Sequence, residues 1–318
     1  MDMAKASAPA SIGNVGVGFD VLGLAFDAAR DTVVAVREAE PGARLGAVSG
    51  LVASLPGTAQ SNTALAAAKA LLDFAGADFG VRLSIDKGIP ISAGMGGSAA
   101  SAVAAVAAVN ALLAEPLDLA GLLPFALEGE RVSSDPPPWD NVAASLHGGL
   151  VIVAREAPDG VHRLPAPREI VSILFHPPIE IETKTARQLL TLSVPMRTAV
   201  EHSRRLAAFV AGCATGDHDL LRAGFEDLLV EPQRAHLLPA LADVKAAAAQ
   251  AGALGCSFSG SGPSVFAWAP ALRADAVAAA MDAAFRGAGL AARAYRAPVD
   301  SGGVRLEAAI DPSRRRAA

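Results

Sequence analysis

An uncharged stretch, PISAGMGGSAASAVAAVAAVNALL, runs from Pro90 to Leu113 and restricts what this chain can fold into. It could be a membrane span, a phosphate-binding loop followed by a helix, or a buried alanine-rich helix. Its length suffices to cross a bilayer. However, Pro90, Gly94, Gly96 and Gly97 crowd its first third, alanine contributes little to lipid partitioning, and the flanks lack aromatic anchors and a basic cluster. We therefore expect no membrane span here.

The first part of this stretch has the composition of a loop that approaches phosphate groups. Residues 81–92 read as a strand leading into a loop, and a helix should follow from Ser98 to about Leu113, closed by Pro116. Glycines let backbone N–H groups approach phosphate oxygens, and a helix N-terminus adds a favourable dipole. A plain glycine turn that packs an alanine helix against a sheet explains the same letters.

Two nucleotide-binding patterns can be compared with this loop. It is not a Walker loop, because neither GKS nor GKT follows the glycines. It does satisfy a loose GxGxxA pattern through Gly94, Gly96 and Ala99, so a dinucleotide site remains an alternative. The stretch alone does not decide between these interpretations.

Composition narrows the class of protein. With 318 residues the chain is long enough for two domains, and its formal charge of −5 argues against a general affinity for nucleic acid. Cys213 and Cys256 form no CxxC pattern, which favours two reduced thiols and a cytoplasmic protein. Met1 to Ser11 does not read as a secretory signal, and Arg314 to Arg316 reads as a solvated tail.

The order of the predicted elements is that of an α-with-β chain without repeats. Strands are expected at 31–38, 81–92, 148–155 and 170–177, with a strand pair within 255–270. Besides the helix after Ser98, a helix is expected near 183–192, helical segments from about 195 to 231 and 237 to 252, and a helix at 272–287. The loop 156–169, rich in proline and charge, is the predicted domain boundary and divides the chain into 1–160 and 161–318.

Two further stretches indicate a family. SAPASIGNVGVGFDVLGLAFD (7–27) and FSGSGPSVFAW (258–268), together with the loop at 90–100, resemble the three motifs of the GHMP kinases. Within that superfamily the first stretch is most similar to homoserine kinases. The residues that fill its pattern are Asn14, Gly16, Gly18, Phe19, Asp20, Leu22 and Gly23. Stretches 129–149, 183–190 and 231–239 extend the resemblance over almost the whole chain.

The resemblance implies a fold and an activity. The fold would be α+β with two domains, the N-terminal one like ribosomal protein S5 domain 2 and the C-terminal one ferredoxin-like, with the active site between them. The activity would be ATP-dependent phosphorylation of the L-homoserine hydroxyl to O-phospho-L-homoserine, a step of threonine biosynthesis. The implied partners are ATP and this small substrate, and neither nucleic acid nor a membrane is expected. The expected location is the cytoplasm, and a homodimer is possible.

The resemblance also implies roles for residues at the ATP end. The residues expected against the phosphates are Pro90, Ile91, Ser92, Ala93, Gly94, Met95, Gly96, Gly97, Ser98, Ala99 and Ala100. Ser98 and Glu130 would hold Mg²⁺, for which a hydroxyl and a carboxylate are suitable oxygen ligands.

At the substrate end the resemblance implies charged and amide contacts. Arg187 and Arg234 would bind the α-carboxylate, since guanidinium forks suit carboxylates. Asp20 would pair with the α-ammonium, while Asn14 and Asn141 would orient the hydroxyl. The catalytic pair is expected to be Asp140 and Asn141, with direct attack by the substrate hydroxyl favoured over proton abstraction by Asp140.

Two departures from the family pattern leave other substrates open. Gly97 replaces the first serine of the usual GLGSS loop, and Pro138 stands where a histidine often precedes the Asp-Asn pair. The alternatives are a GHMP-type kinase for another small hydroxy acid such as threonine, an inactive nucleotide-binding relative, and, through the GxGxxA pattern, a dehydrogenase.

Overall fold

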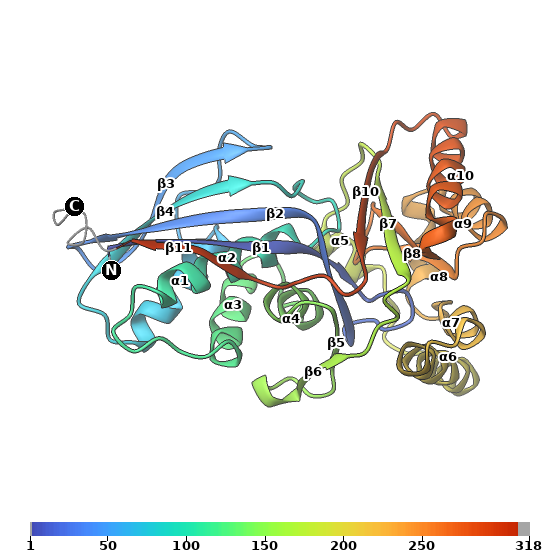
Figure 1. The fold of residues 1–318 in the computed structure, drawn as a ribbon, viewed down its shortest axis with the longest axis horizontal. Helices are drawn as coiled ribbons and strands as arrows, with labels where there is room; N and C mark the ends of the chain where they lie inside the picture. The colour runs from blue at the N-terminus through green and yellow to red at the C-terminus, as the bar shows by residue number, and fades with distance from the viewer. Residues whose placement is uncertain (1, 311–318) are drawn as a thin grey trace.

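Two β-sheets flanked by helices organise the chain, as the computed structural model shows for residues 2–310 (Figure 1). The predicted basic tail, Arg314 to Arg316, lies outside these described residues. The first sheet has the strand order β11-β1-β2-β4-β3, with β5 on β2 and β6 on β5. Its strands are β1 Met3–Gly13, β2 Leu22–Glu38, β3 Gly42–Gly50, β4 Gly80–Lys87, β5 Leu150–Val153, β6 Val161–Leu164 and β11 Arg305–Ile310.

Four helices cover the first sheet. Its strands are contacted by α1 Thr63–Phe74, α2 Gly97–Asn110 and α4 Trp139–His147, and α3 Leu123–Glu130 packs on these three helices. Helix α2 packs against β1 and β2, and every residue from Ala99 to Asn110 except Ala107 is buried. Its alanines allow this close packing because they place little bulk between the sheet and the neighbouring helices. The uncharged stretch is therefore a buried helix, and no helix within residues 2–310 is long and apolar enough to cross a membrane.

The second sheet has the order β10-β7-β9-β8 and is antiparallel throughout. Its strands are β7 Ile170–His176, β8 Gly255–Phe258, β9 Val265–Pro270 and β10 Arg293–Pro298. The helices of this half are α5 Thr183–Gln188, α6 Met196–Thr215, α7 His218–Gly224, α8 Glu231–Arg234, α9 Leu241–Gln250 and α10 Ala274–Gly287. Helices α9 and α10 share one core with the sheet, and Phe209 of α6 packs on Trp268 in the other.

The structure corrects several predicted boundaries. Helix α2 ends at Asn110 rather than near Leu113, because the Asn110 side chain hydrogen-bonds both backbone groups of Leu117 and thereby stabilises a turn. The helical segments predicted from about 195 to 231 are α6 and α7, which are separated at Gly216, where φ is left-handed at 72°. Part of the predicted loop 156–169 forms β6, which pairs with β5. Besides β6, the helices and strands not predicted are β1, β3, α1, α3, α4, α8, β10 and β11.

Both cysteines, Cys213 and Cys256, are buried free thiols in the described chain, as the sequence predicted. The division at residue 160 stays a prediction. The first sheet includes β6 and β11, which lie on the other side of that division in the sequence.

Candidate active site

The loop between β4 and α2 follows a path that only its glycines permit at two points. The values of φ are 52° at Ser92, 70° at Gly94 and 62° at Gly96, all in the left-handed region. A Cβ on Gly94 would lie 2.5 Å from the carbonyl oxygens of Ser259 and Gly262, and a Cβ on Gly96 would lie 2.0 Å from Ser11 Oγ. The glycines therefore let the loop pack between the end of β1 and the β8–β9 connection.

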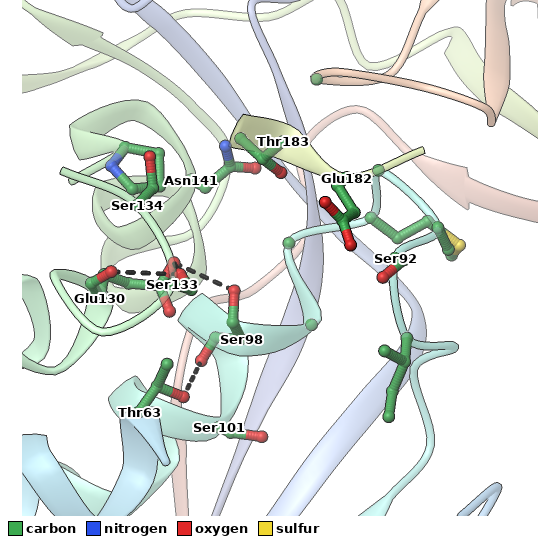
Figure 2. Close-up of a pocket in the computed structure, with 18 of the residues that line it drawn as sticks. Thr63, Ser92, Ser98, Ser101, Glu130, Ser133, Ser134, Asn141, Glu182 and Thr183 are labelled. Atoms are coloured by element: carbon green, nitrogen blue, oxygen red, sulfur yellow. Dashed lines mark hydrogen bonds between the residues drawn. The ribbon is translucent and has the colours of Figure 1, made fainter. Parts of the chain in front are cut away.

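A cavity of about 530 Å³ opens above this loop. Figure 2 shows its polar side chains, with Ser98 at the start of α2 pointing toward Glu130 and Ser133. Thr183 and Asn141 also line the cavity. The volume lies in the range of cofactor and ligand sites. By helix geometry the first N–H groups of α2 have no partner within the helix, so this end of the cavity suits an anion.

Glu130 is a buried acid with one oxygen in use. Its Oε2 accepts hydrogen bonds from Ser98 Oγ at 3.0 Å and Ser133 Oγ at 3.2 Å, and the residue is only 1% exposed. Burial raises the pKa of Glu130 to about 7, against the smaller lowering effects of both serines and Lys87. Within the described residues, Glu130 Oε1 is buried and has no hydrogen-bond partner. Such an oxygen beside the Ser98 hydroxyl is suited to a hard cation.

A buried ion pair, Lys87–Asp31, packs against the end of the loop at the start of α2. The sequence did not indicate this pair. Lys87 donates to Asp31, to the Gly97 carbonyl oxygen and to Ser101 Oγ, while Asp31 also accepts the backbone N–H groups of Gly88 and Ile89. These contacts tie the middle of β2 and the end of β4 to the first turns of α2. This pair joins two neighbouring strands, and it can be recognised in the sequence only once the β2–β4 register is known.

The turn between β1 and β2 places Asn14 and Asp20 in left-handed conformations, with φ of 66° and 56°. Asn14 Nδ2 donates to the Gly260 carbonyl oxygen at 3.0 Å, and Asn14 N donates to Asp140 Oδ2 at 2.9 Å. Asn141 Oδ1 accepts from Ser11 Oγ at 2.9 Å. Residues from three separate motifs therefore meet around one turn.

Asp140 is almost fully buried at the start of α4. Burial, and secondarily the charge of Asp20, raise the pKa of Asp140 to about 6. Besides the bond from Asn14 N, its Oδ1 accepts from Asn141 Nδ2 at 3.3 Å. Both oxygens of Asp140 thus hold neighbouring groups in position.

Two arginines lie beside Phe19, each with its guanidinium carbon 5.4 Å from the ring centre. Arg187 forms a two-point ion pair with Asp20, Nη1–Oδ2 at 2.8 Å and Nη2–Oδ1 at 2.9 Å. Arg234 is 3% exposed, and its Nε donates to the Ala186 carbonyl oxygen at 3.0 Å. Burial, followed by the charge of Arg187, lowers the pKa of Arg234 to about 10, so it remains a cation.

The structure brings the predicted residues into two neighbouring groups. Glu130 and residues 90–98 line the cavity, whereas the predicted Ala99 and Ala100 are buried behind it. Arg187 and Arg234 lie beside Phe19, Asp20 pairs with Arg187, and Asn14 Oδ1 accepts from Asp20 N. Asn141 lines the cavity and connects the groups through Asp140, and Gly260 does so through Asn14. Pro138, the first residue before α4, also lines the cavity. Thr183 and Ser261, which sequence reasoning missed, face each other at 3.3 Å on its wall.

Comparison with known proteins identifies the family to which this chain belongs. The GHMP kinases N terminal domain matches residues 62–149, and the GHMP kinases C terminal domain matches residues 207–287. The chain belongs to the GHMP kinase family. A homoserine kinase of Xanthomonas campestris pv. campestris is 45% identical to this GHMP kinase over 95% of the chain and 94% of that protein. A homoserine kinase of Chlorobium phaeobacteroides is 39% identical over 90% of this chain and 92% of that protein.

A solved structure agrees with these relatives. The crystal structure of homoserine kinase from Cytophaga hutchinsonii superposes with a TM-score of 0.90 and 37% identity, over 96% of this chain and 98% of that one. The predicted α+β, two-domain GHMP kinase fold is therefore confirmed. The chain is a kinase that uses ATP and a small-molecule substrate, and the dehydrogenase interpretation of the GxGxxA pattern is wrong.

Proposed function

We propose that this kinase transfers the γ-phosphoryl group of ATP to the hydroxyl of L-homoserine and forms O-phospho-L-homoserine, a step of threonine biosynthesis. The observation that carries the proposal is the position of two arginines, Arg187 and Arg234, beside Phe19. Hydrogen bonds connect Arg187 through Asp20, Asn14 and Asp140 to Asn141, which lines the cavity with the glycine loop. Guanidinium groups beside the cavity suit the carboxylate of a short amino acid whose hydroxyl would reach the phosphates. The homoserine kinase relatives support the same substrate.

At the ATP end, we assign the phosphates to the loop from Pro90 to Ala100 and to the N-terminus of α2. The fit of a metal ion rests on Glu130, whose buried Oε1 lacks a hydrogen-bond partner in the described chain, and on the adjacent Ser98 hydroxyl. Mg²⁺ commonly takes one or two protein oxygens in addition to substrate phosphates, and it would neutralise charge on the transferred group. The described residues contain no cluster of three or more acidic, His or Cys ligands, which agrees with a metal held largely by the nucleotide.

At the substrate end, Arg234 and Arg187 would bind the α-carboxylate and Asp20 the α-ammonium. Asn14 and Asn141 would orient the hydroxyl for in-line attack. Because both oxygens of Asp140 already accept hydrogen bonds from Asn14 and Asn141, we assign Asp140 to positioning Asn141. The hydroxyl proton then passes to phosphate or solvent rather than to Asp140.

A screen of coupled ADP release across homoserine, threonine, serine, mevalonate and shikimate tests the substrate. We expect the highest specificity constant for homoserine. Pro138 on the cavity wall is the observation that favours a second candidate, a kinase for another small hydroxy acid. A higher specificity constant for threonine would replace the homoserine assignment with that candidate.

Location and assembly are the remaining parts of the proposal. A cytoplasmic location is supported by the two free thiols of the described chain, Cys213 and Cys256. A homodimer stays a prediction, which light scattering of the full chain would test directly.

A further inference from the structure

Two residues that would bind opposite ends of a zwitterionic substrate bind each other in the structure. Arg187 holds Asp20 by two nearly parallel hydrogen bonds of 2.8 and 2.9 Å. The Asp20 side chain is 40% exposed and that of Arg187 is 27% exposed, so a ligand can reach both. Asp20 therefore occupies the arginine fork that the proposed function gives to the substrate carboxylate.

The second arginine differs from the first. No ion pair of Arg234 is present among the described residues, and its Nε is fixed on the Ala186 carbonyl oxygen. Phe19 lies beside both guanidinium groups. Asp20 consequently neutralises one of two neighbouring cations, while the other has no carboxylate partner among the described residues.

We propose that the Asp20–Arg187 ion pair makes this site selective for zwitterions, by competing with every ligand that carries only one of the two charges. The proposal rests on the proposed function, since it takes the same site and the same class of substrate. A zwitterion separates the pair but supplies a new partner to each residue, its carboxylate to Arg187 and its ammonium to Asp20. A ligand with a carboxylate alone must take Arg187 from Asp20 and leaves Asp20 without its counter-ion.

The pair thus selects the charge pattern and not the side-chain length. It disfavours hydroxy acids without an ammonium group, such as mevalonate and shikimate, even where their hydroxyl could reach the phosphates. It does not separate homoserine from threonine or serine, which carry the same two charges. Selection among amino acids must come from the cavity wall.

The test uses two singly charged relatives of homoserine, 4-hydroxybutyrate and 3-aminopropan-1-ol, with the full-length chain. Asp20→Asn suits the experiment because asparagine tolerates the left-handed φ of 56° at this position. We expect its specificity constant for homoserine to fall about tenfold or more, since a charged contact is lost. We expect its affinity for 4-hydroxybutyrate, measured by titration calorimetry, to rise roughly two- to tenfold, as for a well-formed, partly exposed ion pair. Its affinity for 3-aminopropan-1-ol should fall.

Removing a negative charge would attract any anion somewhat better, so the gain is measured again in an Arg187→Gln background. If Asp20 competes with the ligand for Arg187, then Asp20→Asn should raise the affinity for 4-hydroxybutyrate only slightly in that background. The double-mutant cycle isolates the coupling energy between Asp20 and Arg187. Asp300→Asn, which breaks a surface pair with Arg163, is the matched control and should leave both affinities unchanged.

An unchanged or weaker affinity of Asp20→Asn for 4-hydroxybutyrate overturns the proposal, as does an equal gain in the Arg187→Gln background. The proposed function fails by a different result, namely no phosphorylation of homoserine by the native chain. The calorimetric comparison does not depend on turnover, so the two failures are distinguishable.

Discussion

At the scale of single residues, Glu130 carries the clearest sign of an expected partner. A buried carboxyl group costs stability when it is ionised without compensation, and Ser98 and Ser133 bond only one of its oxygens. The raised pKa of about 7 expresses that cost. A cation bound to the other oxygen, Oε1, would offset that cost. Because the cation would arrive with the nucleotide, nucleotide binding would stabilise the ionised form of Glu130.

Glu130→Gln should therefore separate stability from activity. The folded-state pKa of about 7 lies above the usual 4.5, so ionisation of Glu130 destabilises the free protein progressively as pH rises from about 4.5 through 7. In EDTA without nucleotide, we expect Glu130→Gln to melt at a higher temperature than the native chain at pH 8 and at a similar one near pH 5. Turnover should fall by two orders of magnitude or more, and MgATP should raise the melting temperature of the native chain only. A fully active variant would remove Glu130 from the site.

Arg234 allows a second test at this scale. It is buried beside a second cation, Arg187, an arrangement that a structural role alone does not explain. Removing one charge-assisted contact to a carboxylate costs about 1.5–3 kcal/mol, so Arg234→Ala should lower the specificity constant for homoserine roughly ten- to a hundredfold. The Michaelis constant for ATP should stay within about twofold of the native value, and Arg234→Lys should recover only part of the loss.

The comparison substrate for this test is 3-aminopropan-1-ol, which lacks the carboxylate. Native enzyme should use it poorly, and Arg234→Ala should use it about as well as the native enzyme does. If native enzyme phosphorylates it as readily as homoserine, then Arg234 binds something other than a substrate carboxylate.

At the scale of elements, the glycine loop differs from position to position. Gly94 and Gly96 have positive φ and no room for a Cβ, whereas a Cβ on Gly97 would meet Ile89 Cγ2 at 3.1 Å, a contact that a small shift relieves. The backbone at residue 97 therefore does not require glycine, although the family usually has serine there.

Gly97→Ser should consequently fold and bind ATP more tightly. One added hydroxyl contributes about 0.5–1.5 kcal/mol if it reaches a phosphate, so the Michaelis constant for ATP should fall roughly two- to tenfold. Gly94→Ala is the contrasting variant in the same loop and should lower the melting temperature, because φ is positive and two carbonyl oxygens lie 2.5 Å from the new atom. A higher Michaelis constant in Gly97→Ser would indicate that the glycine itself is needed.

The elements that sequence reasoning found and missed differ in physical character. Strands with apolar or alternating patterns, such as β4 and β7, were predictable. Strand β1, MAKASAPASIG, is buried but built from small residues with weak β-propensity, so its pairing and not its composition decides its structure. The Asp31–Lys87 pair depends on strand register, and the Asp20–Arg187 pair joins residues that are far apart in the sequence. Neither can be predicted from a local sequence pattern. Site residues were predictable where a motif carried them.

At the scale of the whole molecule, the two halves share one hydrophobic core. Buried side chains from the second half, including Phe209, Phe225 and Trp268, belong to the same cluster as α2 and β1. The chain also returns at its end, where β11 pairs with β1 as an edge strand of the first sheet (Figure 1). The site between the halves is thereby held by elements that cross from one to the other.

This sharing predicts how the chain unfolds. A fragment of residues 1–160 lacks β6 and β11, which leaves the edges of β5 and β1 unpaired, and it lacks the aromatic side chains that complete its core. We expect the fragment to show no cooperative thermal transition and no ordered near-ultraviolet signal from Trp139, whereas residues 1–310 should melt in a single calorimetric transition. Phe209→Ala in the longer chain should lower that one transition rather than split it, since a buried phenylalanine contributes about 3–5 kcal/mol. A cooperative melt of the fragment near the temperature of the longer chain would instead make the first half an autonomous domain, with β11 and the shared core adding little to its stability.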